Sequence, residues 1–386
     1  MTTELIAPSQ ETVDFLKEQG GDILQLCYQC GTCTATCPWN QVTSFTLRKL
    51  IHKAQLGLVD FEDEEVWKCV ACRLCVDRCP RGVEVPDVMR AIRRVVMEVG
   101  AGVVPHALRI ADKNISGVGN PLGEPRERRT DWAKGLDVKT FTKDTEILYF
   151  PCCYQAYDSR SRAVSRATVT ILNKAKVDFG ILGAEQSCCG ESIRKAGHES
   201  LFQSLARNNI EVFQQAGVKK ILVTSPHCLH TFKDEYPELG GKFEVIHMSQ
   251  FINNLIEEGK IRLTKRLGKK VTYHDSCCLG RYAGIYDDPR QILQSIPSLQ
   301  LVEMRNAREY ALCCGGCAGR LWQETKKGER FSELRIDQAA EAGADVLAVY
   351  CPYCMANFED SLLTSGQSDR IQIVDITELV AEAISA

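Results

Sequence analysis

The sequence has no apolar stretch long enough to cross a membrane, and its first residues, MTTELIAPSQETVDFLKEQG, lack the basic start and apolar run of a secretion signal. It also has little excess charge of either sign, since 47 Lys and Arg balance 50 Asp and Glu to a net charge of −3. This balance gives no electrostatic footprint for nucleic acid or anionic lipid. We therefore expect a cytoplasmic protein without a direct membrane span, associated with a membrane at most through a partner.

Nucleotide-binding and hydrolase motifs are absent as well. The sequence contains no Walker loop, no GxGxxG after an expected strand and no Ser-His-Asp set. Flavin, nicotinamide or ATP would therefore have to be bound by a partner. The 386 residues, 44% of them hydrophobic, are typical of a globular protein. At about 150 residues per domain, they predict two or three domains.

Cysteine is abundant, with 20 residues in tight groups. Stable disulfides are rare in a reducing compartment. Several cysteines are direct neighbours, whose Cα atoms lie about 3.8 Å apart, whereas ordinary disulfides span roughly 4.4 to 6.8 Å. The grouping therefore indicates thiolate ligands of a metal or cluster and predicts oxygen sensitivity.

Two identical runs, C-x2-C-x2-C-x3-C-P, lie within the first 100 residues. This spacing is typical of bacterial [4Fe-4S] ferredoxins, in which the fourth cysteine of each run ligates the other cluster. Two four-cysteine zinc sites are the alternative, although such sites usually use two separated CxxC halves. We expect one cubane cluster on Cys27, Cys30, Cys33 and Cys79, and a second on Cys69, Cys72, Cys75 and Cys37.

Helical patterns flank both runs. Apolar residues keep helical spacing over 45–54, before Gly57, and over 86–99, which starts at Pro86 and ends at Gly100. Residues 20–100 therefore resemble the α-helical ferredoxin domain of heterodisulfide reductase and of succinate dehydrogenase iron-sulfur subunits. The resemblance implies electron transfer and says nothing about a substrate. We place this domain at residues 1–100.

Residues 101–144 lose this periodicity and are rich in Gly, Pro and charge, which predicts an extended linker. The charge run with Arg126, Arg128 and Arg129 is expected to be solvated or to pair across an interface, rather than to bind an anion.

Beyond the linker the sequence repeats itself. The matching cysteines are separated by 124, 125 and 126 residues, the pairs being Cys153 with Cys277, Cys188 and Cys189 with Cys313 and Cys314, and Cys228 with Cys354. Strands alternate with helices in both copies, 145–260 and 268–386, which predicts two α/β units with cysteines at the sheet edge. The expected fold is α+β multidomain, an α-helical ferredoxin domain followed by two duplicated α/β units.

The second copy has five cysteines in this pattern, Cys277, Cys313, Cys314, Cys351 and Cys354. Five thiolates exceed the four that a tetrahedral zinc or a cubane requires, which indicates an unusual cluster. A thioredoxin-like CPYC is the alternative, but three more thiols at matched offsets argue against it.

The order C, CCG, CPxC, given twice, resembles the cysteine-rich CCG domain of heterodisulfide reductase, and the whole chain is similar to the D subunit of that family. The resemblance implies a noncubane [4Fe-4S] cluster on five cysteines, where disulfide sulfurs bind iron and are reduced. A disulfide takes two electrons, whereas cubanes deliver one at a time. It further implies a small thiol or disulfide substrate. The implied partner is a flavoprotein, of the heterodisulfide reductase A or electron-transfer flavoprotein kind, or a membrane haem b subunit.

The first copy departs from the pattern, because Ser225 stands where the second copy has Cys351. Its remaining cysteines are Cys153, Cys188, Cys189 and Cys228. Three interpretations stay open: a noncubane cluster with an altered ligand, a four-thiolate cubane, or a zinc site. We expect the intact second copy to hold the active cluster.

Three cysteines, Cys152, Cys278 and Cys317, lie outside the pattern and are expected to be buried, inert thiols. Cys278 and Cys317 are the candidates for a place beside the active cluster. His227 and His274 are candidate proton donors, although a structural role is expected of each.

The sequence thus favours a catalytic iron-sulfur subunit that reduces or forms a small disulfide and is active within a complex. The alternative is an electron-transfer subunit between a flavoprotein or membrane haem subunit and another enzyme, which Ser225 favours because a degraded first site suggests lost disulfide chemistry. A zinc-bound scaffold would leave the eight ferredoxin cysteines unexplained.

Overall fold

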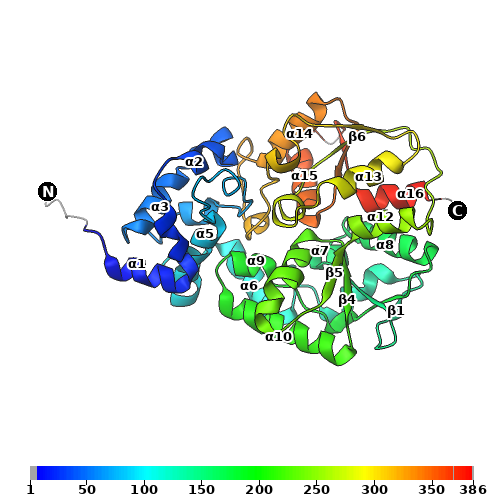
Figure 1. The fold of residues 1–386 in the computed structure, drawn as a ribbon, viewed down its shortest axis with the longest axis horizontal. Coiled ribbons are helices and arrows are strands. Elements are labelled where there is room, and N and C mark those ends of the chain that lie inside the picture. The colour runs from blue at the N-terminus through cyan, green and yellow to red at the C-terminus, as the bar shows by residue number, and fades with distance from the viewer. Residues whose placement is uncertain (1–6, 368, 385–386) are drawn as a thin grey trace.

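The computed structural model describes residues 7–367 and 369–384 of the chain. A helical N-terminal part lies at one end of the molecule, and two α/β units lie one above the other beside it (Figure 1). The chain runs from the helical part through the lower unit to the upper one, where it ends. The expected α+β multidomain fold is confirmed.

The N-terminal part consists of short helices around the two cysteine runs. Its longest helices, α3 (Leu47–Gln55) and α5 (Val85–Arg94), bury their apolar faces and match the two expected helices. A π-helical turn, η4 (Val95–Val99), extends α5 to Gly100. The other elements are α1 (Gln10–Leu16), η1 (Lys17–Gly21), η2 (Asp22–Leu26), α2 (Thr32–Thr36), η3 (Pro38–Gln41) and α4 (Glu65–Lys68).

Residues 101–144 differ from the expected extended linker. They contain the helix α6 (His106–Val118), the 3-10 segment η5 (Arg126–Ala133) and the strand β1 (Lys139–Thr140), which joins the first sheet. The Pro and Gly that interrupt the periodicity cap α6, since Pro105 precedes it and Gly119 ends it. Arg129 is buried, so it is not part of a solvated charge run.

Both α/β units contain parallel sheets of the same design. The strand order is β1-β3-β2-β4-β5 in the first and β7-β6-β8-β9 in the second, so the orders agree once β1 is set aside. The strands β3 and β7 are short and were not expected from the sequence. The strands are β2 (Ile147–Phe150), β3 (Phe179–Ile181), β4 (Lys220–Val223), β5 (Glu244–His247), β6 (Lys270–Tyr273), β7 (Gln300–Val302), β8 (Val346–Val349) and β9 (Gln372–Asp375).

Helices cover both faces of these sheets, as a buried parallel sheet requires. In the first unit they are α7 (Cys153–Tyr157), α8 (Arg162–Lys174), α9 (Glu191–Lys195), α10 (Glu199–Ala216), α11 (Pro226–His230) and α12 (Met248–Glu257). In the second they are α13 (Asp287–Ser295), α14 (Phe331–Glu341), α15 (Pro352–Ser365) and α16 (Ile376–Ala383). Short 3-10 and π segments complete the loops between them, η6 (Gly183–Glu185), η7 (Thr231–Glu235), η8 (Tyr236–Leu239), η9 (Cys278–Tyr282), η10 (Arg308–Tyr310) and η11 (Arg320–Trp322).

The two α/β units pack through α8 against α16 and α12 against α13. Arg160, just before α8, reaches across this interface. Its Nε donates to Glu359 at 2.8 Å, and its Nη1 and Nη2 donate to Glu378 at 2.8 and 2.9 Å. Its Nη2 also donates to the carbonyl of Ile373 at 3.1 Å. These bonds fix one unit, with its cysteine loops, against the other.

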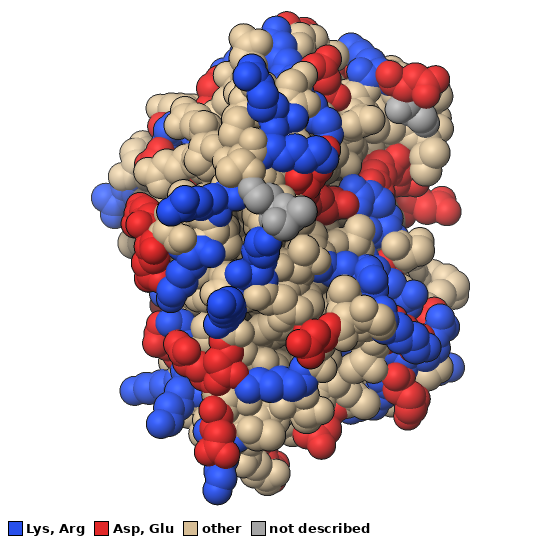
Figure 2. All heavy atoms as spheres, turned by 90° about the vertical axis from the view of Figure 1, so that its right-hand side faces the viewer, with Lys and Arg blue, Asp and Glu red and all other residues tan. Residues whose placement is uncertain are grey.

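Acidic and basic side chains are interspersed over the face formed by the α/β units (Figure 2). This distribution agrees with the net charge of −3. In the described residues, no helix combines the length and the apolar character that a bilayer crossing demands.

Arg160→Ala should weaken the interface between the two units, because it leaves Glu359 and Glu378 without their shared cation. Hydrogen bonds to charged groups contribute about 1.5–3 kcal/mol when buried, and partial exposure reduces this, so we expect a loss of about 1–3 kcal/mol. Anaerobic thermal denaturation measures it. Arg128→Ala, which breaks an exposed pair with Glu124, is the control and should cost under about 0.5 kcal/mol. Equal losses would contradict the role of Arg160.

Candidate iron-sulfur sites

The two N-terminal cysteine runs surround two small cavities. The cysteines lining the first are Cys27, Cys30, Cys33 and Cys79. The cysteines lining the second are Cys37, Cys69, Cys72 and Cys75. Each cavity thus receives three thiols from one run and the fourth from the other run, which is the arrangement of two-cluster ferredoxins.

Both runs follow the same backbone path. The residues just before and just after the second cysteine are left-handed in each, Gln29 and Gly31 with φ of 67° and 87°, Ala71 and Arg73 with φ of 49° and 62°. For residues with a side chain this conformation costs roughly 1–2 kcal/mol. The turn aims amides at sulfur, since the Ala71 N–H donates to the Cys69 Sγ at 3.4 Å. Such a loop fits a cluster held by thiolates, which hydrogen bonds stabilise.

In the second α/β unit the five expected cysteines form one continuous row of thiols. Cys277 contacts Cys313, its neighbour Cys314 lies 3.3 Å from Cys354, and Cys354 contacts Cys351. All five are buried. Cys351 and Cys354 start α15, where the helix dipole favours thiolates. Burial raises the pKa of Cys351, but a hydrogen bond from Cys354 and the charge of His227 outweigh it and bring the pKa to about 6.

The glycine after each cysteine doublet is required by its backbone. Gly190 and Gly315 have φ of 91° and 95°, a region that residues with a Cβ rarely adopt. The turn directs the Gly190 N–H to Cys188 Sγ at 3.5 Å and the Gly315 N–H to Cys313 Sγ at 3.3 Å. The CCG sequence therefore forms the same sulfur-binding turn in both units.

The second ferredoxin run lies directly against the second α/β unit. The thiol of Cys72 hydrogen-bonds with that of Cys313, which lowers the pKa of Cys72 to about 7. Arg281 Nε donates to the Cys72 carbonyl at 2.6 Å, and the Tyr282 hydroxyl donates to the Ala71 carbonyl at 2.8 Å. The guanidinium of Arg281 lies near the thiols of Cys72, Cys277 and Cys313. Its Nη2 is buried and has no hydrogen-bond partner in the described residues.

Arg93 connects the same run to the first α/β unit. Its guanidinium donates to the carbonyls of Val66 at 2.9 Å, Cys69 at 2.6 Å and Lys195 at 3.2 Å. Burial lowers its pKa to about 10, so it stays charged at neutral pH. No sequence signal distinguished Arg93 or Arg281 from other basic residues near helices.

The first α/β unit brings together its four expected cysteines, Cys153, Cys188, Cys189 and Cys228. Cys153 contacts Cys188, and the sulfurs of Cys189 and Cys228 are 3.6 Å apart. Arg129 Nη1 lies 3.7 Å from Cys153 Sγ. Ser225 is fully buried, and its hydroxyl has no partner in the described part of the chain. An unpartnered buried hydroxyl at a ligand position fits a site built for a bound group.

The cysteines outside the pattern are all buried, and none lies apart from the sites. Cys152 contacts Cys228 in the first unit. In the second unit, Cys317 Sγ lies 3.3 Å from Cys277 Sγ and 3.9 Å from Cys278 Sγ. Cys278, Cys317 and His227 place ligand atoms within 4.8 Å of one another.

A buried ion cluster of the first unit faces Cys278. Glu191 Oε1 lies 2.6 Å from Lys195 Nζ and 3.0 Å from His227 Nδ1, and His227 Nδ1 lies 3.5 Å from Cys278 Sγ. Burial would raise the pKa of Glu191, but the two cations hold it well below its usual range. Of these three residues, only His227 was predicted from the sequence as a candidate site residue. Glu191 and Lys195 lie in the segment GESIRK, residues 190–195, and its position next to the first doublet is a signal that could have identified them.

The other candidate proton donor, His274, is also buried. Its Nδ1 accepts a hydrogen bond from Arg335 Nε at 3.3 Å, and its ring packs on Phe358. His274, Cys314 and Cys354 offer ligand atoms within 4.8 Å of one another. His274 therefore lies beside the thiol row of the second unit.

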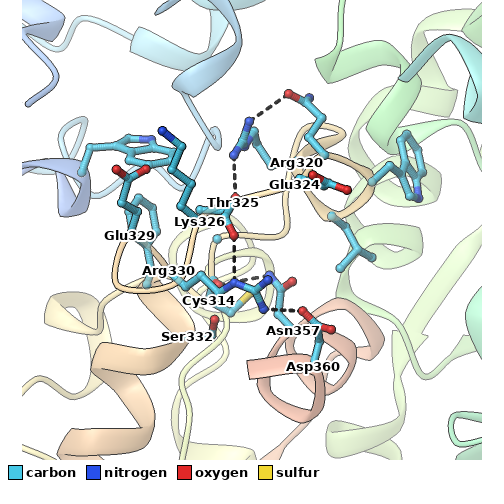
Figure 3. A pocket seen from close by; sticks show the side chains of 16 residues that line it. Cys314, Arg320, Glu324, Thr325, Lys326, Glu329, Arg330, Ser332, Asn357 and Asp360 are labelled. Atoms are coloured by element: carbon cyan, nitrogen blue, oxygen red, sulfur yellow. Dashed lines mark hydrogen bonds and ion pairs between the residues drawn. The ribbon is translucent and has the colours of Figure 1, made fainter. Parts of the chain in front are cut away.

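A cavity of about 610 Å³ opens beside Cys314 (Figure 3). Asn357 Nδ2 donates to the Cys314 carbonyl at 3.1 Å, and Arg330 pairs with Asp360 in the wall. The other lining residues include Trp39 of the ferredoxin domain and the loop 320–326. The cavity therefore reaches one residue of the thiol row, Cys314.

Comparison with known proteins agrees with this geometry. The family described as 4Fe-4S dicluster domain matches residues 23–83, and the cysteine-rich domain CCG matches 147–233 and 271–359. The chain is therefore an iron-sulfur protein with one 4Fe-4S dicluster domain and two CCG domains. The D subunit of the dihydromethanophenazine:CoB–CoM heterodisulfide reductase of Methanosarcina barkeri is 32% identical and aligns over 94% of both chains. The chain belongs to the family of heterodisulfide reductase D subunits.

Other relatives are longer. EtfAB:quinone oxidoreductase of Syntrophomonas wolfei is 35% identical, and the probable iron-sulfur-binding oxidoreductase FadF of Bacillus subtilis is 36% identical. Each alignment covers 83% of this chain and 47% of the relative, so the chain spans about half of their length. A crystal structure of a hypothetical protein from Helicobacter pylori covers 98% of this chain, and 73% of that one, with a TM-score of 0.57 at 10% identity. That likeness shows a shared fold alone.

Arg281→Met should slow electron transfer into the second α/β unit several-fold, because it keeps the volume but removes the cation and the bond to the Cys72 carbonyl. Freeze-quench EPR after addition of a one-electron reductant measures the rate. Iron content should stay unchanged, and Arg128→Met on the surface is the control. A wild-type rate in the Arg281 variant would show that this residue does not couple the sites.

Proposed function

We propose that this protein passes electrons through two cubane [4Fe-4S] clusters to a noncubane [4Fe-4S] cluster of the second α/β unit, which carries out thiol/disulfide redox chemistry. The cubane ligands are Cys27, Cys30, Cys33 and Cys79 for one cluster and Cys69, Cys72, Cys75 and Cys37 for the other. The noncubane ligands are Cys277, Cys313, Cys314, Cys351 and Cys354. The first unit holds a further centre on Cys153, Cys188, Cys189 and Cys228, an iron-sulfur cluster or, alternatively, zinc.

The observation that carries this proposal is the packing of the second ferredoxin run on the five-thiol site, where Arg281 Nε donates to the Cys72 carbonyl at 2.6 Å and the Cys72 thiol lies beside that of Cys313. It joins a ligand of the second cubane to the doublet of the five-thiol site, so electrons need not cross bulk protein. At the other end of the path, Cys30 is exposed, as are Leu26 and Tyr28 beside it. A partner can therefore deliver electrons at the first cubane.

The residues around the second site suit a reaction in which sulfur gains negative charge. When bound, the noncubane cluster supplies the electrons and an iron to which a substrate sulfur can attach. The cavity beside Cys314 admits the small thiol or disulfide. The buried cations Arg281, Lys195 and His227 offset the added charge beside the thiols.

The sequence has no GxGxxG after a strand, so a flavin would have to be bound by a partner. The Methanosarcina barkeri relative is named as part of a heterodisulfide reductase, and the Syntrophomonas wolfei relative as an EtfAB:quinone oxidoreductase. Both names support a complex, in which a flavoprotein or a membrane haem b subunit exchanges electrons with this chain. The substrate is then a small disulfide or the thiols formed when it is reduced, and membrane association runs through the partner.

An electron-transfer subunit without disulfide chemistry is the second candidate. The name of the Syntrophomonas wolfei relative, EtfAB:quinone oxidoreductase, and the serine at the position of Cys351 favour it. In that case the CCG centres act as relays, and the second site does not respond to added thiol.

Anaerobic metal analysis with EPR tests the proposal. At about four irons per cluster, about 16 irons support clusters in both CCG units, whereas about 12 irons with zinc support a zinc-filled first unit. Zinc with almost no iron would instead support a zinc-bound scaffold protein without redox chemistry. The oxidised protein should show a thiol-dependent EPR change.

Cys313→Ser should abolish that thiol-dependent signal while the cubane signals persist, because it removes a ligand from the second CCG site alone. Cys30→Ser is the matched control and should affect the cubane signals first. A thiol response that survives in Cys313→Ser contradicts the assignment. A wild type without any response, but with full iron, favours the electron-transfer function.

A further inference from the structure

We propose that Cys152 supplies the thiol missing at position 225, so that the first α/β unit also holds a five-thiolate iron-sulfur site. The five ligands are Cys152, Cys153, Cys188, Cys189 and Cys228. This inference rests on the proposed function only in taking CCG sites as iron-sulfur sites, and it removes the basis for treating the first unit as degenerate.

The rows of thiols in the two units have the same connectivity. In the second unit the row runs Cys277, Cys313, Cys314, Cys354 and Cys351. In the first it runs Cys153, Cys188, Cys189, Cys228 and Cys152. The first four members match in the sequence repeat. The fifth contacts the fourth in both rows, although Cys152 and Cys351 come from different positions of the repeat.

The sheet explains how two positions can serve one site. The strands β2 and β4 are parallel neighbours, and their last residues, Phe150 and Val223, are paired. Cys152 and Ser225 each stand two residues beyond these ends, so they leave the same edge of the sheet side by side. Cys152 directly precedes α7 and Ser225 directly precedes α11. A thiol on either residue can therefore reach Cys228.

The second unit has the reverse arrangement. Its β6 and β8 pair Tyr273 with Ala348, and the residues that follow these two are His274 and Val349. Two residues further along each segment stand Ser276 and Cys351. The first unit has Cys then Ser at these two junctions, and the second has Ser then Cys. Each unit keeps one thiol and one hydroxyl at the edge of its sheet, and the number of thiols in the row remains five.

The surroundings of Cys152 are those of a ligand. It is 7% exposed, and its thiol lies beside that of Cys228. Ser225 is fully buried, yet its hydroxyl has no hydrogen-bond partner in the described residues. Iron of a sulfide cluster prefers soft thiolate to a serine oxygen, so a cluster held here takes Cys152 as its ligand. Arg129, near Cys153, offsets part of the negative charge of five thiolates.

Three variants of the full chain, purified without oxygen, test this inference. Cys152→Ala should lower iron by about four per chain and abolish the Mössbauer contribution of the first unit. Ser225→Ala should leave both unchanged, because the hydroxyl is not a ligand. The double variant Cys152→Ala/Ser225→Cys should restore the iron, because the new thiol leaves the neighbouring strand end, and this rescue separates ligand loss from misfolding.

The proposal is overturned if Cys152→Ala retains full iron with an unchanged spectrum, or if wild-type protein carries zinc or no metal in the first unit. It is also overturned if Cys152→Ala loses iron that Ser225→Cys does not restore. The thiol-dependent EPR signal of the second unit should persist in all three variants. Absence of that signal in wild type would count against disulfide chemistry, while the iron counts would still decide the role of Cys152.

Discussion

The placement of Cys72 against Cys313 is the constraint on which the rest of the molecule depends, because electrons reach a buried site only through centres that lie close together. Two buried arginines secure this placement. Arg93 and Arg281 both bind peptide carbonyls of the second cysteine run, rather than its thiols. They therefore fix the loop from either side, add positive charge where thiolates gather, and leave every sulfur of the run available to iron.

The duplication gives both α/β units the same arrangement of thiols, and the two units differ in the groups that surround these thiols. Both place their thiols at the carboxyl edge of a parallel sheet, and both use a left-handed glycine to point an amide at sulfur. The second unit adds Cys278 and the cavity beside Cys314, whereas the first adds the charged groups of Glu191, Lys195 and His227. Neither unit alone contains all the groups around the second site. The interface that Arg160 stabilises is therefore needed to hold these groups together.

The sequence was sufficient for features that recur at fixed spacing. The two ferredoxin runs, the repeat and the strands β2, β4, β6 and β8 were predicted, because each shows as a pattern in the sequence itself. The helix α6 was missed because its capping Pro105 and Gly119 resemble the breakers of a linker. The contacts of Arg93 and Arg281 were missed for another reason: they join segments about 100 to 200 residues apart, and no local pattern encodes such a pairing. The part played by Cys152 depends likewise on which strands are neighbours.

The parallel pairing of β2 with β4 also has an evolutionary consequence. Since two strand ends face the same thiol row, a cysteine gained at one end makes the cysteine at the other end redundant. An ancestor that acquired Cys152 first could then lose the thiol at position 225 without ever passing through a four-ligand site. In such a sheet the cysteine spacing of one strand end does not by itself give the number of ligands, because the neighbouring strand end can supply one of them.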